Sequence, residues 1–168
     1  MDVALGGTLD PIHDGHRALF RRAFELGDVT VGLTSDELAK QTRHADRYVR
    51  PFAERKAALE QELERISRDY DRSFEVRKLE TPTGIATEPP FDALVVSPET
   101  KPGGERINEI RRDRGLDPLR IEVVPHVEAA DGDIISSTRI VRGEIDEHGN
   151  LLSEVGEGPP DEEGTVPE

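Results

Sequence analysis

The chain contains no cysteine, few aromatic residues and no long apolar run. The absence of cysteine excludes disulfides, thiolate metal sites, redox dithiols and cysteine nucleophiles. A helix that crosses a bilayer needs about 20 consecutive apolar residues. The segment from Met1 to Leu5 lacks the basic and long apolar regions of a signal peptide. We therefore expect a soluble, cytoplasmic protein that has no membrane partner.

Lysine is also scarce, because 18 of the 22 basic residues are arginine. Against them stand 36 acidic residues, which give a net charge of −14. This balance argues against broad binding to nucleic acid, which needs a positive footprint. Few lysines, many carboxylates and few aromatics indicate a protein solvated for concentrated salt. A merely acidic soluble protein has the same composition, so both interpretations stay open.

The length of 168 residues fits one domain that buries its own core. Strand and helix patterns alternate along it. We expect strands near residues 3–5, 29–33, 74–76, 93–96 and 119–124, and helices near 14–26, 36–40, 51–70, 105–114 and 136–142. Such alternation is typical of βαβ units. The sequence therefore predicts an α/β fold, a Rossmann-like five-stranded parallel sheet with helices on both faces.

The composition changes near residue 150. Residues 151–168 contain six acidic residues, no basic residue and several glycines and prolines. Such a segment cannot bury enough apolar surface to fold. We therefore expect a domain over residues 1–150 and an acidic, disordered tail over 151–168.

A glycine- and histidine-rich segment, Gly-Gly-Thr-Leu-Asp-Pro-Ile-His-Asp-Gly-His, spans residues 6–16. It joins the first expected strand to the first helix, and parallel sheets bind ligands at the carboxyl ends of their strands. Gly6 and Gly7 allow a phosphate to approach the backbone, and the helix start adds N–H groups and a partial positive charge. His13 and His16 are three residues apart and would face one ligand. Half of a zinc site and a pair of helix-capping histidines are the other interpretations of this spacing.

A second segment, Ile-Ser-Ser-Thr-Arg-Ile, spans residues 135–140. By itself a hydroxyl-rich helix start is ordinary capping chemistry. Together, however, the two segments resemble the GTFDPxHxGH and ISSTxxR signatures of the HxGH nucleotidylyltransferases, in this order and at strand-to-helix junctions. In that superfamily the hydroxyl-rich helix start holds the β- and γ-phosphates of the nucleotide.

Further segments narrow the resemblance. They are residues 31–40, 94–100, 103–111, 131–132 and 142–146. With the two signatures, they make residues 1–147 similar to the archaeal type of phosphopantetheine adenylyltransferase, a type that also forms a domain of eukaryotic CoA synthase. The resemblance implies a nucleotidylyltransferase fold. It also implies transfer of AMP from ATP to 4′-phosphopantetheine with Mg²⁺, giving dephospho-CoA and pyrophosphate.

The chemistry of this reaction limits what the protein must supply. The acceptor phosphate has a second pKa near 6 and is mostly dianionic at pH 7, so it needs no general base. The difficulty is the meeting of two anions and the charge that builds on the α-phosphate and the pyrophosphate. We therefore expect catalysis by positioning and positive donors, without a covalent intermediate.

The resemblance assigns two catalytic residues, His16 as a donor to the α-phosphate and Lys40 as a mobile positive charge. It places the acceptor at Thr8, Asp10 and Lys40, where Asp10 would either orient the histidine loop or assist Mg²⁺. The expected ATP-binding residues are Gly7, Thr8, His13, Gly15, His16, Ser97, Glu99, Thr100, Asn108, Arg111, Ser136, Ser137, Thr138 and Arg139. No residue is assigned as a metal ligand. Arg111 belongs to a run of arginines, which is equally typical of a solvated helix face.

The chain departs from the second signature at one position, because Val141 stands where ISSTxxR has arginine. An apolar side chain cannot bind phosphate, so Arg139 or Arg142 must take its place or the contact is missing.

Other functions remain as alternatives, since one fold supports many. One is transfer to another acceptor, such as nicotinamide mononucleotide, or cytidylyl transfer. Residues 7–10 and 135–138 differ from the signatures expected for these two reactions. The alternative from another class is a noncatalytic nucleotide-binding module. Retention of His16 and Lys40 with the hydroxyl cluster argues against it.

The net negative charge should repel ATP unless local cations form a positive pocket. Arg43, Arg47 and Arg50, after Lys40, could supply it as a closing lid. Salt screens distant carboxylates, since the Debye length falls to roughly 3 Å at 1 M. We therefore expect activity to rise with salt in steady-state rates measured from low to molar KCl. A maximum at low salt would contradict this expectation.

Overall fold

The computed structural model describes residues 1–42 and 48–152. Arg43, Arg47 and the acidic tail from residue 153 onward lie outside the described residues. Within the described part, no helix combines the length and apolar character needed to cross a membrane.

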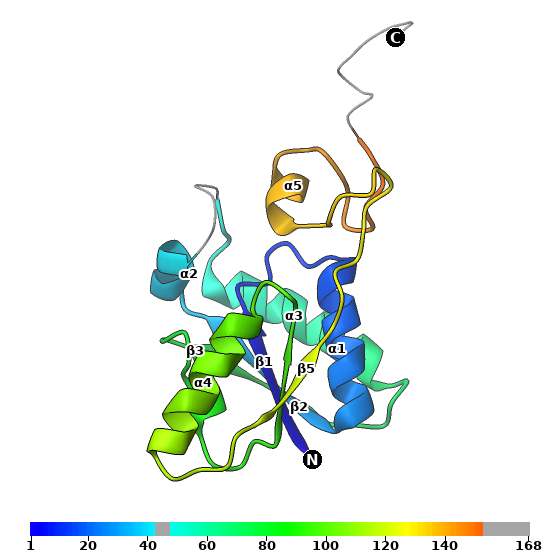
Figure 1. The fold of residues 1–168 in the computed structure, drawn as a ribbon. Coiled ribbons are helices and arrows are strands. Elements are labelled where there is room, and N and C mark those ends of the chain that lie inside the picture. The colour runs from blue at the N-terminus through cyan, green and yellow to red at the C-terminus, as the bar shows by residue number, and fades with distance from the viewer. Residues whose placement is uncertain (43–47, 153–168) are drawn as a thin grey trace, which may run out of the picture.

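Five strands form one parallel sheet (Figure 1). They are β1 (Asp2–Gly7), β2 (Asp28–Thr34), β3 (Phe74–Leu79), β4 (Ala93–Val96) and β5 (Arg120–Val123), in the order β3-β2-β1-β4-β5. The central strand β1 places Val3 beside Val29 on one side and Ala93 on the other. All neighbouring pairs are parallel. The carboxyl ends of the strands therefore lie at one edge, and the predicted five-stranded parallel sheet is confirmed.

The helices are α1 (Asp14–Leu26), α2 (Asp36–Thr42), α3 (Phe52–Ser67), α4 (Lys101–Asp113) and α5 (Ser137–Val141), with a 3₁₀ turn at Ile85–Thr87. Two helix boundaries differ from expectation by three residues or more. Helix α3 ends before Tyr70, whose ring packs on Phe24 at a centroid distance of 6.1 Å, so the apolar stripe continues beyond the helix. Helix α4 begins four residues before Glu105, because Pro102 is accommodated in its first turn.

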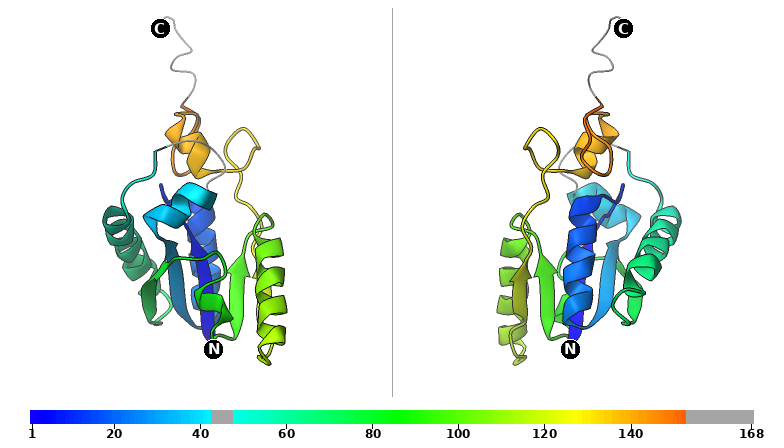
Figure 2. Two further views of the ribbon diagram at one scale, coloured as in Figure 1. Left: turned by 90° about the vertical axis from the view of Figure 1, so that its left-hand side faces the viewer. Right: turned by 90° about the vertical axis from the view of Figure 1, so that its right-hand side faces the viewer.

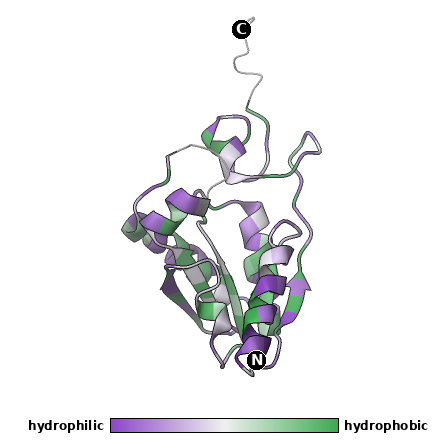
Figure 3. Ribbon diagram, turned by 60° about the vertical axis from the view of Figure 1, so that its left-hand side comes forward, coloured by the Kyte–Doolittle hydropathy of each residue, from purple (hydrophilic) through white to green (hydrophobic). Residues whose placement is uncertain are grey.

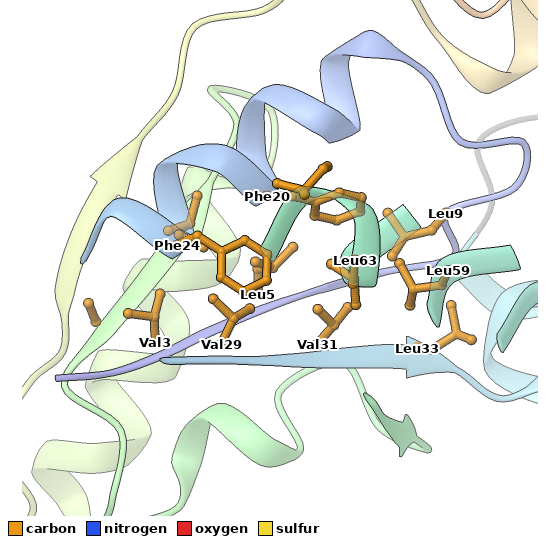
Figure 4. Packing of buried hydrophobic residues seen from close by; sticks show 14 residues of the cluster. Val3, Leu5, Leu9, Phe20, Phe24, Val29, Val31, Leu33, Leu59 and Leu63 are labelled. Atoms are coloured by element: carbon orange, nitrogen blue, oxygen red, sulfur yellow. The ribbon is translucent and has the colours of Figure 1, made fainter. Parts of the chain in front are cut away.

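Alternation along the strands divides the apolar residues between two faces. Val3 and Leu5 pack with α1 and α3, where Phe20 and Phe24 are fully buried (Figure 4). Ala4, between them, belongs to a second cluster that contains Ile107 of α4. Colouring by hydropathy shows apolar residues along the central strands and hydrophilic residues on the outer helix surfaces (Figure 3). Helices thus cover both faces and leave the carboxyl edge for ligands.

The chain after β5 returns to this edge. It carries a small apolar cluster of Ala129, Ile135 and Ile145. Both side views place α5 beyond the carboxyl ends of the strands, opposite the N-terminus (Figure 2). The backbone N–H of Asp14 donates to the carbonyl of Glu147 at 2.9 Å, so the late segment is tied to the start of α1.

Candidate active site

A cavity of about 590 Å³ lies at the carboxyl edge of the sheet. Its walls come from the end of β1, the start of α1, the junction of β4 with α4, the chain after β5 and the start of α5. Most of the expected ATP-binding residues line it: Gly7, Thr8, His13, Gly15, His16, Ser97, Glu99, Thr100, Ser136, Ser137 and Thr138. Segments more than 120 residues apart in the chain thus face one space.

The two histidines form a stacked pair at the start of α1. Their ring centroids are 3.8 Å apart. The N–H of Gly15 donates to Nδ1 of His13 at 3.0 Å, and the N–H of His13 donates to Nδ1 of His16 at 3.3 Å. The histidines therefore cap the helix, as one alternative held, and they also line the cavity. Because each Nδ1 accepts, the proton of the neutral ring lies on Nε2, which makes Nε2 a donor.

Glycine at position 15 is required by this pair. A Cβ atom there would lie 2.8 Å from Cε1 of His13 and 2.9 Å from its Nδ1. Any larger residue would push the His13 ring out of its capping position. The spacing of the motif thus has a steric cause as well as a chemical one.

The hydroxyl-rich segment of residues 135–140 is hydrogen-bonded directly to the loop that follows β1. Oγ of Ser137 donates to the carbonyl oxygen of Pro11 at 2.8 Å. Ser136 caps α5 by accepting from the N–H of Arg139 at 3.2 Å. The serine pair and His16 consequently lie on the same side of the molecule, around one cavity.

Thr8 belongs to a chain of hydrogen bonds that leads to the buried side chains of Thr34 and Arg55, which the sequence analysis missed. The hydroxyl of Thr34 donates to that of Thr8 at 3.0 Å, and Nη1 of Arg55 donates to Thr34 at 3.2 Å. Arg55 is fully buried. In the sequence it is one arginine among the charged residues of an amphipathic helix, and nothing in that pattern distinguishes it.

Comparison with known proteins agrees with this geometry. Residues 4–143 match the cytidylyltransferase-like family. The phosphopantetheine adenylyltransferase of Methanosarcina acetivorans is 42% identical over 155 residues, which cover 90% of this chain and 96% of that protein. The protein of the same name from Methanothermobacter thermautotrophicus is 43% identical, with 91% and 90% covered. The chain belongs to the phosphopantetheine adenylyltransferase family. This confirms the resemblance seen in the two signatures.

A solved structure supports the fold of this family member. A crystal structure from Archaeoglobus fulgidus, described as a protein with unknown function, is 37% identical and superimposes with a TM-score of 0.64. The match covers 74% of this chain and 89% of that one.

Three of the expected ATP-binding residues, Asn108, Arg111 and Arg139, do not line the cavity of this family member. The side chain of Asn108 holds the backbone of Leu119 in both directions, at 3.0 and 2.7 Å. Arg111 is 2% exposed and donates to the carbonyls of Ala86, Glu88, Phe91 and Asp117. The two residues are three apart on α4 and share a helix face, and that face packs against the protein. In this structure the contacts of both side chains are structural, and neither side chain faces the cavity expected to hold ATP.

Arg139 is one of the two arginines considered as a replacement for the arginine that is missing at Val141, and the structure shows what it contacts. Its guanidinium pairs with Asp131 at 2.5 Å and Glu144 at 2.9 Å, and it does not line the cavity. Arg139 therefore braces the loop around α5 in this structure, outside the cavity in which its contact with the nucleotide was expected. Val141 is exposed, and Arg142 forms no ion pair with any described residue.

Asp10 and Arg50 form a hydrogen-bonded ion pair. Asp10 is buried, and its carboxylate accepts from the backbone N–H of Arg50 at 2.9 Å and from Nε at 2.7 Å. Of the two roles considered for Asp10, orienting the loop fits these contacts. Arg50, expected in a positive lid, is instead bound to this carboxylate.

Lys40 lies on α2 and is exposed. It lines a neighbouring hollow of about 240 Å³ together with Asp36 and Tyr48, separate from the main cavity.

Among the described residues, no group of three or more His, Cys, Asp or Glu side chains is arranged to hold a metal ion. The zinc alternative thus finds no further ligand there.

The buried capping role of His13 predicts a pH effect on stability. Burial, followed by the nearby charge of Arg17, lowers the pKa of His13 from 6.5 to about 4. Between these values the unfolded chain binds a proton that the folded chain does not. The contribution to stability is therefore complete above pH 6.5 and is lost as the pH falls toward 4, by up to about 3 kcal/mol.

Urea unfolding at several pH values between 4 and 7 measures this loss. His13→Asn keeps a capping side chain without the titrating ring. We expect its stability to fall less than that of the wild type over this window. Equal pH slopes for the two proteins would contradict the assignment.

Proposed function

We propose that this chain catalyses the transfer of AMP from ATP to 4′-phosphopantetheine, releasing pyrophosphate and giving dephospho-CoA. The observation that carries the proposal is that the two signature segments line the same cavity. They are joined by the hydrogen bond from Ser137 to Pro11, and His16 lines the cavity with them. The archaeal relatives that share about 42% of their residues carry the name of this activity. The enzyme would work in the cytoplasm, where ATP is available, and its acidic surface would suit concentrated salt.

The bond changes are simple. A phosphate oxygen of the acceptor attacks the α-phosphorus of ATP, and the bond to the β,γ-pyrophosphate breaks. No proton has to leave the attacking dianion. The protein must hold two anionic groups together and stabilise the charge that develops on the α-phosphate oxygens.

The geometry suits His16 for the developing charge. Its Nδ1 is occupied by the backbone of His13, so Nε2 carries the hydrogen that donates. The stacked ring of His13 limits rotation of the His16 ring. Donors fixed before the reaction stabilise a transition state without further reorganisation. Ser136 and Thr138 offer hydroxyl hydrogens for the β- and γ-phosphates in the same cavity, while the hydroxyl hydrogen of Ser137 is directed to Pro11.

The acceptor is proposed to lie over Thr8 on the side of β2. There the cavity continues between apolar side chains, Leu38, Leu79 and Ile85, which suit an uncharged arm. Lys40, on the neighbouring helix, remains the proposed mobile charge for the acceptor phosphate.

Mg²⁺ is proposed as the metal of the reaction. It usually binds one or two carboxylates, phosphate oxygens and waters rather than an all-protein cage. The described residues gather no ligand cluster and Asp10 is already bound to Arg50, so phosphate oxygens and waters would supply most of the ligands. When bound to the triphosphate, the ion neutralises charge on the leaving pyrophosphate.

A pyrophosphate-release panel in high salt tests the substrates. ATP or CTP is offered with phosphopantetheine, nicotinamide mononucleotide or glycerol phosphate. We expect turnover with ATP and phosphopantetheine alone, because the cavity joins a hydroxyl-lined end to an apolar one. Turnover only with nicotinamide mononucleotide would overturn the assignment of the acceptor.

Replacement of His16 tests the donor. We expect His16→Ala to lower kcat by about 10²- to 10³-fold, as the loss of one preorganised donor does. Melting of the variant, followed by circular dichroism, controls for the lost helix cap. A folded variant with unchanged kcat would show that the ring does not act on the reacting phosphate.

A further inference from the structure

Arg55 is buried completely between the strands and helices that flank Thr8. Its Nε donates to the carbonyl of Arg50 at 2.8 Å, and Nη2 donates to Asp36 at 3.0 Å. Nη1 is shared between the hydroxyl of Thr34 at 3.2 Å and the carbonyl of Thr8 at 3.3 Å. One side chain thus joins the loop after β1, the end of β2, the start of α2 and the segment before α3.

Burying a charge is costly unless it is paired and hydrogen-bonded. The carboxylate that pairs with Arg55 is that of Asp36, which is 58% exposed, so much of the charge is compensated at the surface. Arg111 is a useful contrast, because it is equally buried and donates to backbone carbonyls alone. Arg55 differs in that one of its partners is a hydroxyl that leads to the cavity.

That hydroxyl chain has a direction. A guanidinium can only donate, so Oγ1 of Thr34 must accept from Arg55. The hydrogen of Thr34 is then directed to Oγ1 of Thr8, 3.0 Å away. Thr8 accepts in turn, which leaves its own hydrogen for a group in the cavity that it lines. Hydrogen bonds in such a chain polarise and strengthen one another.

We propose that Arg55 is a positioning residue for the acceptor phosphate. It fixes Thr8 as a hydrogen-bond donor and, through Asp36, it anchors the first turn of the helix that carries Lys40. This inference rests on the proposed adenylyl transfer. The four partners of Arg55 lie at or after the carboxyl ends of β1 and β2 or precede α3, and none of them belongs to β4, α4 or α5. Loss of the Arg55 side chain should therefore weaken the binding of the acceptor far more than the binding of ATP.

Thr34 offers the sharpest test, because two variants of similar size separate the hydroxyl from packing. Thr34→Val breaks the chain, and Thr34→Ser keeps it. We expect Thr34→Val to raise KM for phosphopantetheine by about 10- to 100-fold, the effect of one lost hydrogen bond to a charged group. KM for ATP should change by less than about twofold. Thr34→Ser should restore most of the acceptor binding.

Arg55→Lys and Arg111→Lys form a second pair. Both replace a buried guanidinium by an ammonium that cannot reach all the partners. Both should lower the melting temperature, but only Arg55→Lys should raise KM for phosphopantetheine. Calorimetric titration with phosphopantetheine and, separately, with ATP gives a binding readout that does not need turnover. If Arg55→Lys does not fold, the Thr34 pair decides.

The outcomes distinguish this inference from the function on which it rests. A wild type that neither binds nor adenylylates phosphopantetheine overturns the proposed function. A wild type that does so, with Thr34→Val and Thr34→Ser equal in acceptor KM, overturns the role of Arg55 alone. Equal increases in both KM values for Arg55→Lys would also overturn it, since they indicate a general loss of structure.

Discussion

The site depends on one long-range contact, in which the serine hydroxyl at the start of α5 donates to the carbonyl of Pro11. The early loop supplies the histidines and the late helix supplies the hydroxyls, so neither segment forms the cavity alone. The parallel sheet makes the contact possible because every strand ends at the same edge. The backbone bond between Asp14 and Glu147 holds the same two segments a second time.

Arginine has two different uses in this lysine-poor chain. Some arginines form exposed ion pairs along helices, such as Arg106 with Glu109. Three others, Arg17, Arg55 and Arg111, are buried and join elements that are distant in the sequence. A guanidinium presents five donors in a fixed plane, and it can therefore satisfy several carbonyls at a point where segments meet. Charge composition alone does not separate these uses.

The sequence was sufficient for the fold and for much of the site. Short apolar runs predicted all five strands, and the position of residues 6–16 between the first strand and the first helix placed His13 and His16 at that junction. Asn108 and Arg111 show where this reasoning ends. Their spacing of three put them on one helix face, but periodicity does not say whether that face meets a ligand or the protein's own carbonyls. Arg55 was missed for the same reason, since its partners come from four separate segments.

The separation of the cavity walls along the chain has a consequence for synthesis. Domains fold as the ribosome releases them, beginning at the N-terminus. β1 and its loop emerge first, but they cannot form the complete cavity until residues 134–138 follow. Until then, a nascent chain carries the histidine pair without its opposite wall. Completion of the cavity by the growing polypeptide is therefore delayed until residues 134–138 have been synthesised.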